Sequence, residues 1–320
     1  MTTRTHTPTP ASQALDGPGV RGLDPPAGPA LDALLQSALD EDRASEDVTS
    51  LACIAAQGRA RATLVAKQPG VLAGLSVFAR VFALVDAEVA CVLHHGDGDR
   101  VERGALCAEL EGSARALLAG ERTALNLLQR MSGVATLTAR YVDAAAGGAR
   151  ILDTRKTTPG LRALEKYSVR CGGGHNHRFD LADQAMVKDN HIDFARVERF
   201  VDGGAAELVD AMRALGGADL IITIEARDRE QALAAAAAGA DVVLLDNMSD
   251  EAMASLCPEV RAAAQASPRG RNELELEASG GIDLARVAAV ARTGVDRISV
   301  GALTHSAPAL DLSLRMEAAE

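Results

Sequence analysis

In the second half of the chain, short apolar runs alternate with longer helical patterns. The runs contain few polar residues, as is typical of parallel strands that are buried on both faces. The stretches between them, such as 194–215 and 229–238, have the length and composition of helices. Strands that alternate with helices predict a parallel α/β sheet. The expected strands are 151–152, 184–187, 220–224, 242–245, 274–278 and 297–300.

The first half of the chain has a different pattern. Residues 60–67 alternate partially between apolar and polar positions, and glycine-rich turns follow, as in antiparallel sheets. The stretch 114–146 is rich in Ala and Leu and predicts a helix, with Gly120 and Gly133 as weak points or breaks. These patterns predict an α+β sandwich. Its other expected elements are helices over 31–42 and 73–85 and a strand over 89–93.

Length and composition divide the chain further. A chain of 320 residues suits two domains. Residues 1–29 are rich in Thr, Pro, Gly and Ala and are expected to form a disordered tail, because they offer little apolar surface to bury. We expect the sandwich domain over 30–133 and a catalytic α/β domain over 134–305, with 306–320 packing on the sandwich. Two smaller expectations are a short helix over 310–320 and a solvated loop over 262–272.

Charge and cysteine content restrict the class of protein. The net charge of −11 and the pI near 5.2 argue against a nucleic-acid-binding surface, which needs a broad basic face. The five scattered cysteines indicate free thiols in a reducing compartment. Neither a secretory signal nor an apolar run long enough to span a membrane is recognisable. The sequence predicts a cytoplasmic protein that binds neither nucleic acid nor a membrane.

Polar residues follow the predicted strands, and four of those near the first two strands are cations: Arg155, Lys156, Arg178 and Lys188. Arg offers a planar fork that suits carboxylate and phosphate, whereas Lys offers a compact charge. In an acidic chain, this cluster indicates a pocket for a small polyanion. Polar groups after successive parallel strands favour an α/β barrel over an open sheet, which would concentrate its site at one switch point. The groups after the six strands are Thr154-Arg155-Lys156, Lys188, Glu225, Asp246, Ser279-Gly280-Gly281 and Gly301.

Several motifs in a fixed order point to a known family. They are Glu121-Arg122-Thr123, Thr154-Arg155-Lys156-Thr157, Gly174-His175-Asn176-His177-Arg178, Val187-Lys188-Asp189-Asn190-His191, Ile224-Glu225, Leu245-Asp246-Asn247-Met248, Glu277-Ala278-Ser279-Gly280-Gly281 and Ser299-Val300-Gly301-Ala302-Leu303-Thr304-His305. In order and spacing, over roughly residues 31–318, this series resembles the quinolinate phosphoribosyltransferases. The resemblance implies an incomplete, seven-stranded α/β barrel. It also implies that quinolinate and phosphoribosyl pyrophosphate, with Mg²⁺, give nicotinate mononucleotide, carbon dioxide and pyrophosphate, a step of de novo NAD biosynthesis.

The residue types suit that reaction. A dicarboxylate calls for more than one cation, and the glycine-rich turns let backbone N–H groups approach a phosphate. We expect Lys156, Lys188, Glu225 and Asp246 to be catalytic, with the two acids holding ribose hydroxyls or Mg²⁺ waters; a structural ion-pair role for them is the alternative. No dedicated metal site is expected, because the substrate phosphates would hold most of the Mg²⁺. The expected substrate-binding residues are these four together with Arg122, Thr154, Arg155, His177, Arg178, Ser279, Gly280, Gly281, Val300, Gly301, Ala302 and His305.

The resemblance also implies a partner. In the family, the arginine that matches Arg122 reaches into the barrel mouth of the neighbouring subunit. We therefore expect a homodimer at least, with a hexamer also open.

Three alternatives remain at this stage. A barrel lyase or aldolase would use Lys156 or Lys188 to form a Schiff base, which requires a desolvated lysine with few anions nearby. A phosphoribosyltransferase that uses nicotinate would bind one carboxylate and release no carbon dioxide. A catalytically inactive binding protein is disfavoured, because every expected site position is occupied by a suitable residue.

Overall fold

The computed structural model describes residues 24–194 and 200–319, which divide into two compact units. The first unit comprises the described residues up to Ala139, Thr158–Gly173 and the segment from Ser306 onward. The second comprises Arg140–Thr157 and Gly174–His305. The unit boundary thus falls inside a long helix, a few residues after the expected boundary at 133. Of the expected tail, residues 1–23 lie outside the described part, as do residues 195–199 of the helix expected over 194–215.

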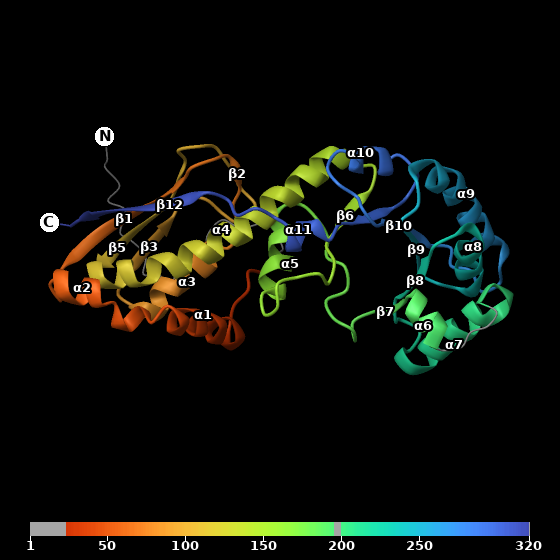
Figure 1. Cartoon of the computed structure of the whole chain (residues 1–320), viewed down its shortest axis with the longest axis horizontal. Coiled ribbons are helices and arrows are strands. Elements are labelled where there is room, and N and C mark those ends of the chain that lie inside the picture. The colour runs from red at the N-terminus through yellow and green to blue at the C-terminus, as the bar shows by residue number, and fades with distance from the viewer. Residues whose placement is uncertain (1–23, 195–199, 320) are drawn as a thin grey trace, which may run out of the picture. The chain divides into compact units, whose positions relative to one another are not determined.

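The first unit is built on a four-stranded antiparallel sheet in the order β12-β1-β5-β3. The central strand β1 buries alternate residues, including Ala62 and Leu64, so one face of the sheet carries the core. In Figure 1, β12 at the blue end of the chain runs beside β1 near the red end. The strands are β1 (Arg59–Ala66), β3 (Ala90–Leu93), β5 (Leu106–Ser113) and β12 (Leu312–Ala318), with a separate pair β2 (Gly70–Val71) and β4 (Arg100–Val101).

The prediction of a helix over 310–320 is wrong, because Leu312–Ala318 form the strand β12. Leu312 and Leu314 are buried, whereas Ser313 is partly buried and Arg315 is exposed, and this alternation has the period of a strand. Leu314 lies opposite Leu64 of β1. The pairing also covers the edge of β1, which would otherwise present unpaired backbone groups.

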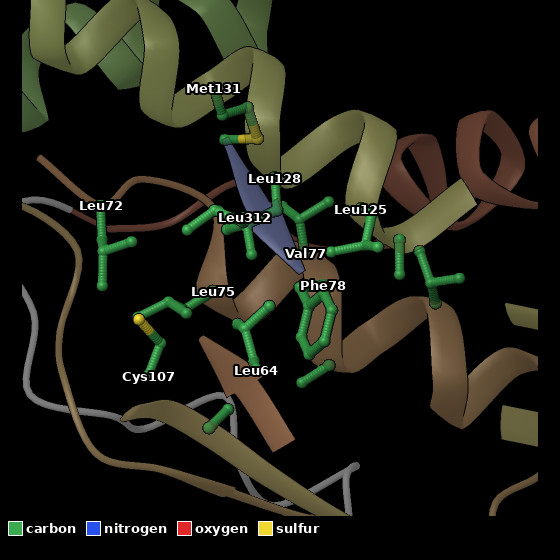
Figure 2. Packing of buried hydrophobic residues seen from close by; sticks show 14 of the residues in the cluster. Leu64, Leu72, Leu75, Val77, Phe78, Cys107, Leu125, Leu128, Met131 and Leu312 are labelled. Carbon is green, nitrogen blue, oxygen red and sulfur yellow. The ribbon is translucent and has the colours of Figure 1, made fainter. Parts of the chain in front are cut away.

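Helices cover the buried face of this sheet. Leu31, Leu35 and Leu39 are spaced for one face of α1 and are all buried. Figure 2 shows Leu64 of the sheet, Phe78 of α3 and Leu128 of α4 within one apolar cluster. The helices are α1 (Pro29–Glu41), α2 (Val48–Cys53), α3 (Leu75–Val85), α4 (Ala114–Ala145) and α5 (Arg162–Cys171), with a short 3-10 helix η2 (Ala44–Glu46).

The two glycines expected to weaken the long helix do not interrupt α4. A Cβ at Gly120 would lie 2.9 Å from the ring of Phe82. A Cβ at Gly133 would overlap the carbonyl oxygen of Pro308. Both positions therefore permit close packing against α4, which explains glycine in a continuous helix.

The second unit contains a parallel sheet of six strands in the order β6-β11-β10-β9-β8-β7. Each expected strand is present within about two residues at either end. Helix α8 packs on β8 and β9 and beside α9. The strands are β6 (Arg150–Leu152), β7 (Ala185–Val187), β8 (Ile222–Ala226), β9 (Val242–Asp246), β10 (Glu275–Ser279) and β11 (Arg297–Ser299). The helices are α6 (Asp189–Phe194), η3 (Phe200–Gly204), α7 (Ala205–Gly216), α8 (Arg229–Ala238), α9 (Asp250–Ala266), α10 (Val287–Val290) and α11 (Ala302–His305).

The structure describes six strands in this sheet where seven were expected. On the open side of β6, His175 makes a single parallel bridge to Leu152. The next backbone N–H, that of His177, donates to the side chain of Asp153 and not to a main-chain carbonyl. The main-chain pairing with β6 ends there, because the Asp153 side chain accepts the hydrogen bond that a main-chain carbonyl would accept in a longer strand.

The loop expected over 262–272 begins later than expected, because α9 continues to Ala266. Two of its arginines form ion pairs: Arg269 with Asp210 at 2.8 Å and Arg271 with Asp241. Across the described residues, every helix falls short of the length and apolar character that a bilayer span needs.

Candidate active site

A cavity of about 920 Å³ lies at the carboxyl ends of the strands in the second unit. Asp246 and Ser279 are the last residues of β9 and β10, and Lys188 directly follows β7. Carboxyl ends of parallel strands lie on one side of a sheet, and their side chains therefore converge there. The lining comprises Tyr141, Thr154, Arg155, Lys156, His177, Arg178, Met186, Lys188, Glu225, Leu244, Asp246, Asn247, Glu277, Ser279, Gly280, Gly281, Ile282, Asp283, Ser299, Val300, Gly301, Ala302 and His305.

The structure brings the expected site residues together around this cavity, with one exception. Arg122 belongs to α4 in the first unit and is not among the lining residues. The lining includes residues that the sequence reasoning missed, among them Tyr141, Asn247, Glu277 and Asp283.

Two arginines, the buried Arg178 and the partly buried Arg155, contribute positive charge to the lining. Arg178 is only 6% exposed, and its Nη1 donates to the carbonyl oxygen of Gln184 at 2.9 Å. Burial, together with the nearby charge of Arg155, lowers the pKa of Arg178. The Nε of Arg155 is buried and has no hydrogen-bond partner among the described residues. A buried guanidinium beside a second one whose Nε–H is buried without a partner favours an anion between them, so this part of the cavity suits a carboxylate or phosphate.

Two hydrogen bonds fix the backbone of Lys156. Its N–H donates to Thr154 Oγ1 at 3.1 Å, and its carbonyl oxygen accepts from Thr304 Oγ1 at 2.8 Å. A Cβ at Gly301 would lie 3.1 Å from both Lys156 Cδ and His305 Nε2. The absence of a side chain at position 301 thus leaves room for the side chains of Lys156 and His305 to pass.

The two expected acids have separate partners. Lys188 Nζ lies 2.8 Å from Glu225 Oε2, with the lysine side chain about half exposed and the Glu225 side chain 11% exposed. Asp246 Oδ2 accepts from the Asn247 amide at 2.7 Å. Both carboxylates nevertheless line the cavity.

His177 sits in a network that continues into the interior of the sheet. Its Nδ1 accepts from the Arg178 N–H at 2.7 Å, and its Nε2 lies 3.4 Å from Glu277 Oε2. Glu277 is fully buried and also pairs with Arg297 at 2.7 Å. Burial alone would raise the pKa of Glu277, but the His177 hydrogen bond and the Arg297 charge outweigh it and hold that pKa at about 2. The expected strand 274–278 contains two glutamates, Glu275 and Glu277, and a charged residue in a buried strand is the sequence signal for this buried group.

The glycine-rich turn after β10 has a backbone that favours glycine. Gly280 and Gly281 have φ values of +96° and +60°. A side chain at either position would be strained, and at Gly280 it would also meet Asn247. The turn therefore exposes main chain to the cavity, where N–H groups suit a phosphate.

The described side chains of His, Cys, Asp and Glu do not form any group of three or more placed to hold a metal ion. The carboxylates of Glu225 and Asp246 are among the acidic side chains that line the cavity. Oxygen ligands of this kind suit Mg²⁺ that keeps several waters and is shared with substrate phosphates.

Comparisons with known proteins match the whole of this architecture. Residues 47–132 match the family model for the quinolinate phosphoribosyl transferase N-terminal domain, and residues 134–315 match that for its C-terminal domain. The chain is 43% identical to the probable carboxylating nicotinate-nucleotide pyrophosphorylase of Bacillus subtilis, over 89% of this chain and 92% of that protein. It is 39% identical to the human carboxylating nicotinate-nucleotide pyrophosphorylase, over 96% and 97% of the two chains.

Solved structures agree. The crystal structure of NadC from Streptococcus pyogenes is similar with a TM-score of 0.82 and 41% identity, over 91% of this chain and 97% of that one. Human nicotinic acid phosphoribosyltransferase is similar with a TM-score of 0.56 at 16% identity, over 92% and 74% of the two chains, which is a likeness of fold alone.

Proposed function

The chain belongs to the quinolinate phosphoribosyltransferase family, and from this premise we propose that it converts quinolinate and phosphoribosyl pyrophosphate into nicotinate mononucleotide, carbon dioxide and pyrophosphate. The observation that carries the proposal is that the buried Arg178, the partly buried Arg155 and Lys188 line one cavity. Quinolinate has two adjacent carboxylates on a pyridine ring. Three cations around a small ring match a dicarboxylate better than a monocarboxylate.

The remaining lining residues suit the phosphoribosyl group. We assign the 5′-phosphate to the main chain of the turns at 279–281 and 300–302, with His305 nearby. Lys156 faces the pyrophosphate, and Glu225 and Asp246 face the ribose hydroxyls. Glu225 and Asp246 are also the residues that would hold Mg²⁺ through its waters, and the metal would neutralise pyrophosphate charge.

The chemistry then has two parts. The bond from the ribosyl C1 to pyrophosphate breaks while the bond from C1 to the pyridine nitrogen forms, through an oxocarbenium-like transition state. Lys156 stabilises the departing anion and the acids stabilise the developing positive charge on the sugar. The alkylated ring nitrogen is positively charged, so it stabilises the carbanion left when the adjacent carboxylate departs as carbon dioxide. That carbon then takes a proton. Orientation and electrostatic complementarity suffice for this second part.

The alternatives are less well supported. A Schiff-base lysine should be desolvated with few anions nearby, whereas Lys188 is half exposed and paired with Glu225. A nicotinate-using enzyme would leave Arg155 or Arg178 without a carboxylate, at a cost of roughly 1–3 kcal/mol or more.

A subunit partner supplies Arg122 in this proposal. Two-fold pairing would exchange Arg122 twice and produce two shared sites in a homodimer or a larger assembly such as a hexamer. Mixing the inactive variants Arg122→Ala and Lys156→Ala tests this. Random exchange should restore up to about a quarter of wild-type activity, because one site in each mixed dimer carries neither defect. Absence of recovery despite demonstrated exchange would exclude a shared site.

Two finer features belong to the same proposal. We take the single parallel bridge between His175 and Leu152 as a very short seventh strand, which would make the sheet an incomplete seven-stranded barrel. The five free cysteines, four of them buried, suit the reducing cytoplasm.

The direct test is a product assay. Purified protein with quinolinate, phosphoribosyl pyrophosphate and Mg²⁺ should form nicotinate mononucleotide, and Lys156→Ala should lose most of that activity. Nicotinate in place of quinolinate should be turned over far more slowly. Formation of no product by the folded wild-type protein would refute the proposed function.

A further inference from the structure

Asn247 has an unusual backbone conformation at the edge of the cavity. It directly follows Asp246 at the end of β9 and has φ +55°, in the left-handed region that favours glycine or asparagine. Its N–H donates to the carbonyl oxygen of Ser279 at 2.9 Å, which joins the ends of β9 and β10. This backbone is therefore locked in place by the neighbouring strand.

The side chain of Asn247 is confined on two sides. Its Nδ2 donates to Asp246 Oδ2 at 2.7 Å. On the other side, a Cβ at Gly280 would overlap the amide oxygen and lie 2.6 Å from Cγ, so the amide lies directly against the glycine. The left-handed backbone is what turns the amide back toward the carboxylate of the preceding residue.

From this geometry we propose that Asn247 is a positioning residue, which holds the Asp246 carboxylate in the orientation that receives the phosphoribosyl group. The inference rests on the proposed function of Asp246 and adds a residue that acts only through it. A hydrogen bond to an ionised group is worth about 1.5–3 kcal/mol, which corresponds to roughly a 10- to 150-fold change in affinity. Because the amide faces Asp246, its loss should affect phosphoribosyl pyrophosphate and leave the dicarboxylate subsite unchanged.

Three variants separate the amide from the backbone. Asn247→Gly keeps the left-handed conformation and removes the amide. Asn247→Asp keeps the shape but places a carboxylate against Asp246. Ala146→Gly is the matched control, because Ala146 also has a positive φ (+49°) and does not line the cavity.

The experiment measures binding by calorimetry, so that it does not depend on turnover. Mg²⁺–phosphoribosyl pyrophosphate is titrated into protein saturated with phthalate, which carries two adjacent carboxylates but no ring nitrogen and therefore cannot react. We expect Asn247→Gly to weaken this binding by about 10-fold or more and Asn247→Asp to weaken it further. Phthalate affinity should stay within about two-fold, and Ala146→Gly should match the wild type.

A double-mutant cycle identifies the route of the effect. If Asn247 acts through Asp246, then Asn247→Gly should cause no further loss in an Asp246→Ala background. Additive losses, or an Asn247→Gly affinity equal to that of the wild type, would overturn the inference. A wild-type protein that binds phthalate but forms no product from quinolinate would instead refute the proposed function.

Discussion

Replacing Arg297 with methionine should destabilise the fold strongly, because it leaves the Glu277 carboxylate buried without its main cationic partner. Glu277 has no exposed side-chain surface, Arg297 has 11%, and the two lie 2.7 Å apart. The His177 hydrogen bond and the Arg297 charge outweigh burial and hold the pKa of Glu277 at about 2, so the carboxylate is ionised in the folded protein. Breaking a buried pair from one side costs about 3–5 kcal/mol, because the remaining charge is left buried without its partner.

The assay is urea unfolding at pH 7 of the wild type, Arg297→Met, Glu277→Gln and the double variant. We expect a loss of about 3–5 kcal/mol for Arg297→Met, and a smaller loss for Glu277→Gln, because Arg297 keeps Glu275 at 3.0 Å. The double variant should lose less than the sum of the two. The exposed pair Arg229 and Glu259 is the control, and Arg229→Met should cost less than about 1 kcal/mol.

The same carboxylate sets a pH dependence. Its pKa is depressed in the folded protein, so its contribution is fully present above about pH 4.5 and is lost as the pH falls toward about 2. The stability difference between wild type and Glu277→Gln should therefore shrink between pH 5 and pH 3. A loss of unfolding free energy below about 1 kcal/mol for Arg297→Met at pH 7 would contradict a strong buried pair between Arg297 and Glu277. Strictly additive losses in the double variant would contradict it as well.

Further predictions concern packing and thiol reactivity. Gly133→Ala should destabilise by about 1–3 kcal/mol in urea, although Gly→Ala in an open helix stabilises, because the new Cβ would overlap the Pro308 carbonyl; an increase in stability would contradict this packing. Leu128→Ala should cost about 2–5 kcal/mol, since Leu128 is fully buried in the core of Figure 2, and a loss under 1 kcal/mol would argue against that core. Burial raises the pKa of Cys91 to about 12 and that of Cys107 to about 11, so Cys53 alone should react quickly with a thiol reagent at pH 8; a second fast thiol would contradict this.

Much of the second unit could be predicted from sequence, for a physical reason. Buried parallel strands are continuous apolar runs, and the residues after them are polar, so both the sheet and the lining of its cavity are encoded locally. Lys188 after 184–187 and Asp246 after 242–245 are examples. Arg122 differs, because it lies in α4 of the first unit and the role we propose for it depends on a partner chain, which no local sequence pattern reports.

The sequence-based predictions were wrong where contacts between distant segments determine the secondary structure. Residues 312–318 alternate with a period of two, but only the open edge of β1 makes that segment a strand. Gly120 and Gly133 resemble helix breakers until Phe82 and Pro308 are placed against them. Asn247 could not be singled out, because its importance lies in a positive φ and a contact with Gly280, which the sequence does not reveal.

In the proposed reaction, this cavity couples phosphoribosyl transfer to decarboxylation of a dicarboxylate. The coupling can be measured directly by following carbon dioxide from quinolinate labelled in the carboxyl group beside the ring nitrogen, together with pyrophosphate, in one reaction. We expect labelled carbon dioxide and pyrophosphate in a one-to-one ratio, with neither released when Lys156 is replaced by alanine. Pyrophosphate released without labelled carbon dioxide would contradict it.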